Sequence, residues 1–207
     1  EHIYKSYQGG LIFDNVTRDV SSMPLLKIDS TVMMPAKEVL ERVYGESVKS
    51  GERFAHIAKC FAENFSDAEV EFFTSPGRTE VVGNHTDHNG GKIVAASISL
   101  DTIGAAAANG TGTIRILSEG YDKIEVEIAK ASSVEKKSGT KALIAGMVEA
   151  IGKFGYKVEG FDAYMTTEVI AAAGVSSSAS FEMMFCAILS NVLENAMHAV
   201  QELPEDK

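Results

Sequence analysis

The sequence predicts an α+β domain with a mixed sheet. Several segments of strand character follow one another with short, hairpin-length connections. A helix, a further strand and a long amphipathic helix come after them. A doubly wound parallel sheet needs a helix between most of its strands, and here several consecutive strands have none between them.

The first elements are helical. Residues 1–34 show no strong period, and a helix is expected from Pro35 to about Tyr44. A second helix is expected to begin at Gly51, because apolar residues then recur at helical spacing. These residues are Phe54, Ile57, Ala58, Phe61 and Phe65. A short strand from Val70 to Phe73 leads into a glycine-rich stretch that is expected to be a loop.

Four strands are expected next, over residues 93–100, 103–108, 113–117 and 124–128. The sequence Asn-Gly-Thr-Gly at 109–112 predicts a hairpin turn between the second and the third of them.

The remaining elements alternate between helix and strand. Residues 117–128 alternate charged and apolar side chains, which is typical of the exposed face of an edge strand. A helix is expected from Lys141 to about Gly155, then a strand from Phe161 to Ile170. A strongly amphipathic helix begins within residues 176–178 and continues with apolar residues at positions i, i+3, i+4 and i+7.

Composition and charge limit the partners and the cellular location that we expect for this protein. The chain has 207 residues, a net charge of −10 and a pI of about 5.0, which argue against nucleic acid as the main partner. It has no charged-then-apolar leader, and no apolar run approaches the ~18 residues of a membrane span. We therefore expect a cytoplasmic protein with no membrane partner. Nothing in the sequence predicts its oligomeric state.

The stretch "SPGRTEVVGNHTDHNGG" concentrates glycine and ionisable residues at positions 75–91. His85, Asp87 and His88 have the look of metal ligands, as in a metal-dependent hydrolase. The binuclear hydrolase pattern needs a further histidine at the position of Gly83. A solvated turn is a second alternative.

A third interpretation, a loop that binds a polar substrate, explains the same stretch better. Its glycines allow the backbone to approach a ligand closely, and Arg78 supplies a fixed positive charge. Asp87 and His85 can accept and donate hydrogen bonds to hydroxyl groups. This combination favours a polyol or sugar over a metal.

A second stretch, "AAAGVSSSASFEMM" at residues 171–184, passes from small residues into the start of the amphipathic helix. The first N–H groups of a helix lack internal partners and carry the positive end of the dipole, so phosphate binds there readily. Simple N-capping by Ser176 or Ser177 is the alternative. Neither the Gly-x-Ser-x-Gly elbow nor the Walker sequence is present.

These two stretches, in this order and about ninety residues apart, resemble the GHMP small-molecule kinases, and galactokinases most closely. The first runs Pro-Gly-Arg-Thr-Glu-Val-Val-Gly-Asn-His-Thr-Asp-His-Asn-Gly-Gly over 76–91, and the second Ala-Ala-Gly-Val-Ser-Ser-Ser-Ala over 172–179. The resemblance extends from about Leu40 to Asn191. It implies an N-terminal domain of the ribosomal protein S5 domain 2-like type and ATP-dependent phosphorylation of a sugar at its anomeric hydroxyl.

The resemblance also assigns roles. Arg78 matches the arginine that supports the reacting groups, where developing phosphoryl charge needs a fixed cation. Asn84, His85 and Asp87 match sugar-contacting positions. The hydroxyl of Ser178 matches a ligand of Mg²⁺. The phosphate loop for ATP is matched by Gly174, Val175, Ser176, Ser177, Ser178 and Ala179.

Several positions depart from the family pattern. Asn84 replaces a glutamate that holds a sugar hydroxyl, Glu80 an asparagine, and His88 a tyrosine, while Ala172 makes the phosphate loop less glycine-rich. These departures keep open a non-catalytic sugar and nucleotide sensor built on the kinase fold.

The expected domain organisation is an extension over 1–50 and a galactokinase-like domain over 51–207. The family's catalytic aspartate and its C-terminal domain are absent from this chain. We therefore expect the chain alone to turn over little substrate.

Overall fold

The computed structural model describes residues 26–28, 32–83, 92, 94–170 and 177–201. Its main element is a five-stranded sheet of order β3-β4-β7-β5-β6. The strands are β3 (Glu71–Val82), β4 (Val94–Ala108), β5 (Thr113–Ser118), β6 (Ile124–Glu127) and β7 (Phe161–Thr167). Only the β5–β7 pair is parallel. The predicted α+β class with a mixed sheet is therefore confirmed.

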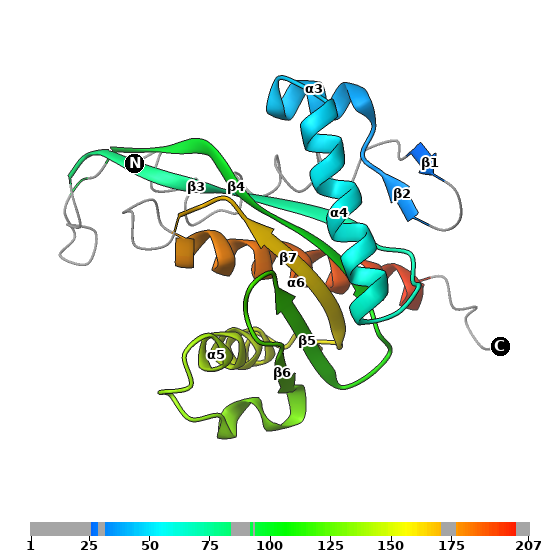
Figure 1. Cartoon of the computed structure of the whole chain (residues 1–207). Coiled ribbons are helices and arrows are strands. Elements are labelled where there is room, and N and C mark those ends of the chain that lie inside the picture. The colour runs from blue at the N-terminus through cyan, green and yellow to red at the C-terminus, as the bar shows by residue number, and fades with distance from the viewer. Residues whose placement is uncertain (1–25, 29–31, 84–91, 93, 171–176, 202–207) are drawn as a thin grey trace.

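Helices cover both faces of this sheet (Figure 1). They are α3 (Lys37–Tyr44), α4 (Val48–Asn64), the 3-10 helix η2 (Ile128–Ser133), α5 (Thr140–Lys153) and α6 (Ser177–Gln201). Two short antiparallel strands, β1 (Leu26–Ile28) and β2 (Val32–Met34), form a separate two-stranded sheet. The helices expected near these positions are confirmed, although α4 begins three residues before Gly51.

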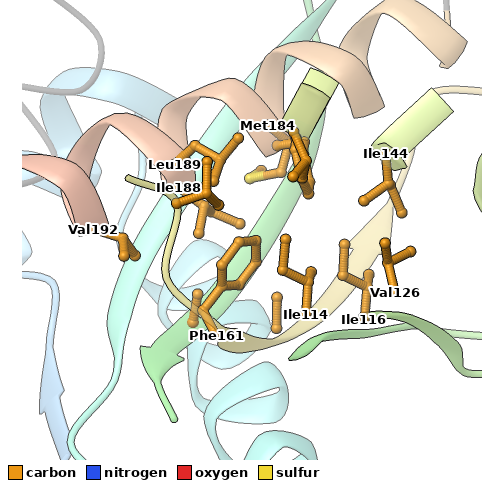
Figure 2. Packing of buried hydrophobic residues seen from close by; sticks show 14 of the residues in the cluster. Ile114, Ile116, Val126, Ile144, Phe161, Met184, Ile188, Leu189 and Val192 are labelled. Carbon is orange, nitrogen blue, oxygen red and sulfur yellow. The ribbon is translucent and has the colours of Figure 1, made fainter. Parts of the chain in front are cut away.

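Each face of the sheet has its own apolar core. On one face, α5 and α6 pack on the sheet, and Figure 2 shows Ile144 of α5 and Met184 and Ile188 of α6 close to the strand side chains. Phe161 of β7 and Phe185 of α6 lie there with ring centroids 5.7 Å apart. On the other face, α3 and α4 pack through a second cluster. It includes Leu40, Phe54, Ile57, Phe61, Phe72 and Ile103. The sequence periodicity of the helices is explained by these two contacts.

The predicted hairpin at residues 109–112 is wrong. β4 and β5 do not pair, because β7 lies between them and pairs with both. Residues 161–165 of β7 are all buried, so this strand needs neighbours on both edges and a helix layer on both faces. The turn is instead closed against the residue before β7: Asn109 N donates to Gly160 O at 3.1 Å, and Gly160 N to Thr111 O at 3.0 Å.

Two further strand predictions need correction. The strand expected at 70–73 continues to Val82, so the first part of the expected glycine-rich loop is a strand. The two strands expected over 93–108 form the single strand β4. Before Thr102, β4 pairs only with β3, and the two form an arm that projects from the sheet (Figure 1). β6 lies at the sheet edge, as the charge alternation predicted.

Candidate functional site

Arg78 lies on β3, near the base of the two-stranded arm, where it pairs with Ser97 of β4. The β3–β4 register shifts between Pro76 and Arg78, so the Pro-Gly-Arg motif coincides with an irregularity in the ladder. The Arg78 guanidinium is half-buried and contacts the carboxylate of Glu80, with Nη2 and Oε1 3.2 Å apart. The family departure at Glu80 therefore places a negative charge beside the arginine.

The first turn of α6 contains the described part of the serine-rich stretch. Ser177 and Ala179 are half-buried, and Ser178 is exposed. This turn has no acidic side chain, so nothing there opposes the positive end of the helix dipole. The exposed hydroxyl of Ser178, the small side chains and the N–H groups that have no intrahelical acceptor at a helix start together suit an anion with several oxygen atoms.

One hydrogen bond joins the two motif regions. Ser180 is buried, with 2% of its surface exposed, and its hydroxyl donates to the backbone carbonyl of Ser75 at 2.8 Å. Ser75 lies three residues before Arg78, and Ser180 two residues after Ser178. The structure therefore brings the arginine strand and the serine-rich helix start together, although they are about a hundred residues apart in the sequence.

A buried carboxylate supports the same strands from the opposite face of the sheet. Asp101 of β4, 4% exposed, accepts hydrogen bonds from Tyr44 Oη at 2.7 Å, Thr74 Oγ1 at 2.6 Å and Arg53 Nη2 at 2.7 Å. Burial, and then the negative charge of Asp101, raise the pKa of Tyr44, which keeps this phenol a neutral donor. These contacts attach α3 and α4 to β3 and β4.

The other predicted site residues lie outside the described part of the chain. These are Asn84, His85 and Asp87 of the first stretch and Gly174, Val175 and Ser176 of the second. The metal alternative also falls there, since it rests on His85, Asp87 and His88. Among the described residues, no group of three or more His, Cys, Asp or Glu side chains is arranged to hold a metal ion. Within that same part of the chain, no helix is long and apolar enough to cross a membrane.

The sequence reasoning missed the polar residues that support the site. Asp101 and Thr102 are adjacent in a mostly apolar strand, and Ser180 follows the serines at 176–178, so none of the three forms a motif of its own. The available signal was their position: a carboxylate or hydroxyl within a core strand or on a core-facing turn requires buried hydrogen-bond partners.

Comparison with known proteins adds independent findings. Residues 59–108 match the galactokinase galactose-binding signature. A galactokinase of Lactococcus lactis subsp. lactis (strain IL1403) is 36% identical over 140 residues, covering 66% of this chain and 35% of the relative. A galactokinase of Bacillus subtilis (strain 168) is 28% identical over 145 residues, covering 68% and 37%. The chain thus spans about a third of the length of these curated relatives.

Solved structures agree with this result. The structure of Lactococcus lactis galactokinase complexed with galactose matches with a TM-score of 0.62 and 32% identity, over 68% of this chain and 37% of that one. The mevalonate kinase of Methanococcus jannaschii matches with a TM-score of 0.50 at 12% identity, over 59% and 40%, which is a likeness of fold alone.

The sheet and its two helical layers are similar in fold to those of the GHMP small-molecule kinases, a class that includes the galactokinase and mevalonate kinase structures above. In sequence, the chain is similar to about a third of the length of galactokinases, and it matches the galactose-binding signature over the end of α4, β3 and β4.

Proposed function

We propose that the protein is an ATP-dependent sugar 1-kinase of the galactokinase type, which phosphorylates the anomeric hydroxyl of galactose or a related hexose. The observation that carries the proposal is the hydrogen bond between Ser180 and Ser75. It holds the arginine strand against the serine-rich helix start, in a chain that is 36% identical to a galactokinase over 140 residues. A phosphoryl transfer site needs these two elements close together.

Arg78 supports the phosphoryl group in transfer. Its guanidinium is fixed in orientation by Glu80 and carries a permanent positive charge, which is worth most where negative charge develops. Because Glu80 offsets part of that charge, we expect the arginine to act mainly through directed N–H groups. Asn84, His85 and Asp87 are proposed to bind the sugar hydroxyls, and the neutral Asn84 makes a weaker acceptor than a carboxylate.

The first turn of α6 fits the phosphates of ATP. It offers helix N–H groups, small side chains, the half-buried hydroxyl of Ser177 and the exposed hydroxyl of Ser178, with no acidic residue in the turn. The hydroxyl of Ser178 could also serve as the one protein ligand of Mg²⁺, because this cation usually keeps several waters and takes other ligands from substrate phosphates. When bound, the cation neutralises phosphate charge. The chain's own contribution is to orient the phosphates through Gly174, Val175, Ser176, Ser177, Ser178 and Ala179.

The domain assignment is part of the proposal. We assign residues 51–207 to the N-terminal domain of the kinase and residues 1–50 to an extension. Relatives about three times as long as the matched region support the view that turnover requires residues outside this chain. We also propose that the protein acts in the cytoplasm on small molecules, with no nucleic acid or membrane partner.

A coupled assay of the complete gene product tests this function. ADP formation is followed with ATP, Mg²⁺ and a panel of hexoses, each at saturating concentration. We expect ADP release that depends on galactose or a close epimer. Measurable sugar binding by calorimetry without ADP release from any hexose would instead identify a non-catalytic sensor, and loss of bound zinc in His85→Ala would identify a metallohydrolase.

A further inference from the structure

Five polar groups are joined by four successive hydrogen bonds that reach from the end of β7 to the two motif regions, and we name this arrangement the hydroxyl chain. It runs from Val169 N through Thr167 Oγ1, Thr102 Oγ1 and Ser180 Oγ to the carbonyl of Ser75. The successive distances are 3.1, 2.8, 2.8 and 2.8 Å. The hydroxyl chain connects β7, β4, α6 and β3 in that order.

The proton order of the hydroxyl chain follows from elimination. The Ser75 carbonyl can only accept, so the Ser180 hydroxyl donates its one proton there. Ser180 then has none left for Thr102, and Thr102 must donate to Ser180. By the same step Thr167 donates to Thr102, and the N–H of Val169 supplies the last donor. Each hydroxyl therefore donates once and accepts once, and a single direction satisfies all of them.

Thr102 is the central member of this arrangement. It is 4% exposed and pairs directly with Thr167 across the β4–β7 ladder and with Ser75 across the β3–β4 ladder. Its hydroxyl bonds both the end of β7, through Thr167, and the first turn of α6, through Ser180. Removing it leaves a buried Ser180 hydroxyl without a donor and breaks the connection between those two elements.

We propose that Thr102 is a positioning residue: its hydroxyl ties Ser180, which also bonds Ser75 of β3, to Thr167 at the end of β7, and so fixes the start of α6 relative to Arg78. This inference rests on the proposed kinase function. The first turn of α6 binds the phosphates in that function, and Arg78 supports the group transferred. A displacement between them of the order of 1 Å is enough to cost ~100-fold in rate. Thr102 touches neither substrate in this account and acts only through Ser180 and Thr167.

Three variants of the complete gene product test the inference. Thr102→Val keeps the shape of the side chain and removes the hydroxyl, and Thr102→Ser restores the hydroxyl. Thr166→Val is the matched control, because it removes a threonine hydroxyl from the same strand as Thr167 at a site where the partner is the exposed Glu119. The kcat, the KM for ATP and the KM for galactose are measured at a temperature where circular dichroism shows every variant folded.

We expect Thr102→Val to lose ~10- to 100-fold in kcat while the KM for galactose changes less than about threefold, because the displaced group is the phosphate-binding turn. Thr102→Ser should recover to within about threefold of the unmodified protein, and Thr166→Val should keep its kcat. A folded Thr102→Val protein with unchanged kcat would overturn the inference, as would equal losses in Thr102→Val and Thr166→Val.

Amide hydrogen exchange on the same proteins separates the inference from the function on which it rests. Thr102→Val should raise the exchange rate at Val169 and in the first turn of α6, and Thr166→Val should not. If the unmodified protein phosphorylates no sugar, the proposed function is wrong. If Thr102→Val leaves the exchange rates of these amides unchanged, the hydroxyl chain does not hold the start of α6 in place, and the inference is wrong. Raised exchange together with unchanged kcat in an active enzyme would overturn the positioning role alone.

Discussion

Asp101→Asn is predicted to lower the free energy of unfolding substantially, because it changes a buried carboxylate at the centre of a hydrogen-bond network. The carboxylate is 4% exposed and accepts three hydrogen bonds of 2.6–2.7 Å, from Tyr44, Thr74 and Arg53. An asparagine of nearly the same shape keeps only one acceptor oxygen and turns an amide donor toward groups that also donate.

The magnitude follows from counting these bonds. A hydrogen bond to a charged group contributes about 1.5–3 kcal/mol, against about 0.5–1.5 kcal/mol for a neutral one. Three such bonds each weakened by about 1 kcal/mol give a loss of ~3 kcal/mol in the free energy of unfolding. This predicted loss lies below the largest losses known for broken buried ion pairs, about 5 kcal/mol. The reason is that the Arg53 side chain is 21% exposed, so water can partly replace the lost carboxylate.

The assay is urea unfolding followed by far-UV circular dichroism, since the chain contains no tryptophan. Glu168→Gln is the matched control. Its carboxylate faces the same arginine at 3.5 Å but is 50% exposed, so its removal should change the free energy of unfolding by less than about 0.5 kcal/mol. Equal losses in the two variants, or a loss below about 1 kcal/mol in Asp101→Asn, would refute the reasoning from burial.

Three further predictions concern separate regions. Gly160→Ala should lower the free energy of unfolding by ~3 kcal/mol in urea titration, because a Cβ there would lie 2.3 Å from a backbone carbonyl oxygen; Gly112→Ala, with no atom within 4 Å, should leave it nearly unchanged. Hydrogen bonding, first from His56, lowers the pKa of Glu119. Its contribution is therefore complete above its unfolded pKa of about 4.3 and is lost as the pH falls through the lower folded value, so Glu119→Gln should flatten the acid limb of stability measured against pH, and an unaltered limb would contradict this. Asn84→Glu should lower the KM for galactose ~5-fold in the complete gene product, since a charged acceptor adds about 1 kcal/mol, whereas an unchanged KM would remove this residue from sugar recognition.

Much of the fold followed from local pattern. The helices α4, α5 and α6 each carry an apolar stripe that contacts one face of the sheet, and that stripe is visible in the sequence as a 3.6-residue period. The α+β fold class could also be predicted from the sequence, because consecutive strands with no helix between them exclude a doubly wound parallel sheet.

Strand order did not follow, and the reason is physical. Asn-Gly at 109–110 specifies a chain reversal, but a reversal does not determine whether the two flanking strands pair. β7 enters between them from residues 161–167, and only its fully buried side chains hint at a central position. The residues of a turn cannot indicate that a strand about fifty residues later will pair with both of the strands that flank the turn.

The sequence motifs predicted Arg78 and the serines of α6 as site residues, and these roles stay predictions. The structure places the two motif regions against each other. The groups that hold them, Thr102 and Ser180, form bonds between segments about eighty residues apart, so no local spacing announces them. In the sequence, that network is visible only as a threonine within a mostly apolar strand and a serine at the start of an amphipathic helix.

The most direct test of the central claim is the product formed by the complete gene product with ATP, Mg²⁺ and galactose, identified by ³¹P nuclear magnetic resonance. We expect phosphate on the anomeric hydroxyl, formed ~100- to 1,000-fold more slowly when Arg78→Met removes the charge and keeps the bulk of the side chain. No sugar phosphate, phosphate on another hydroxyl, or full activity in Arg78→Met would contradict it.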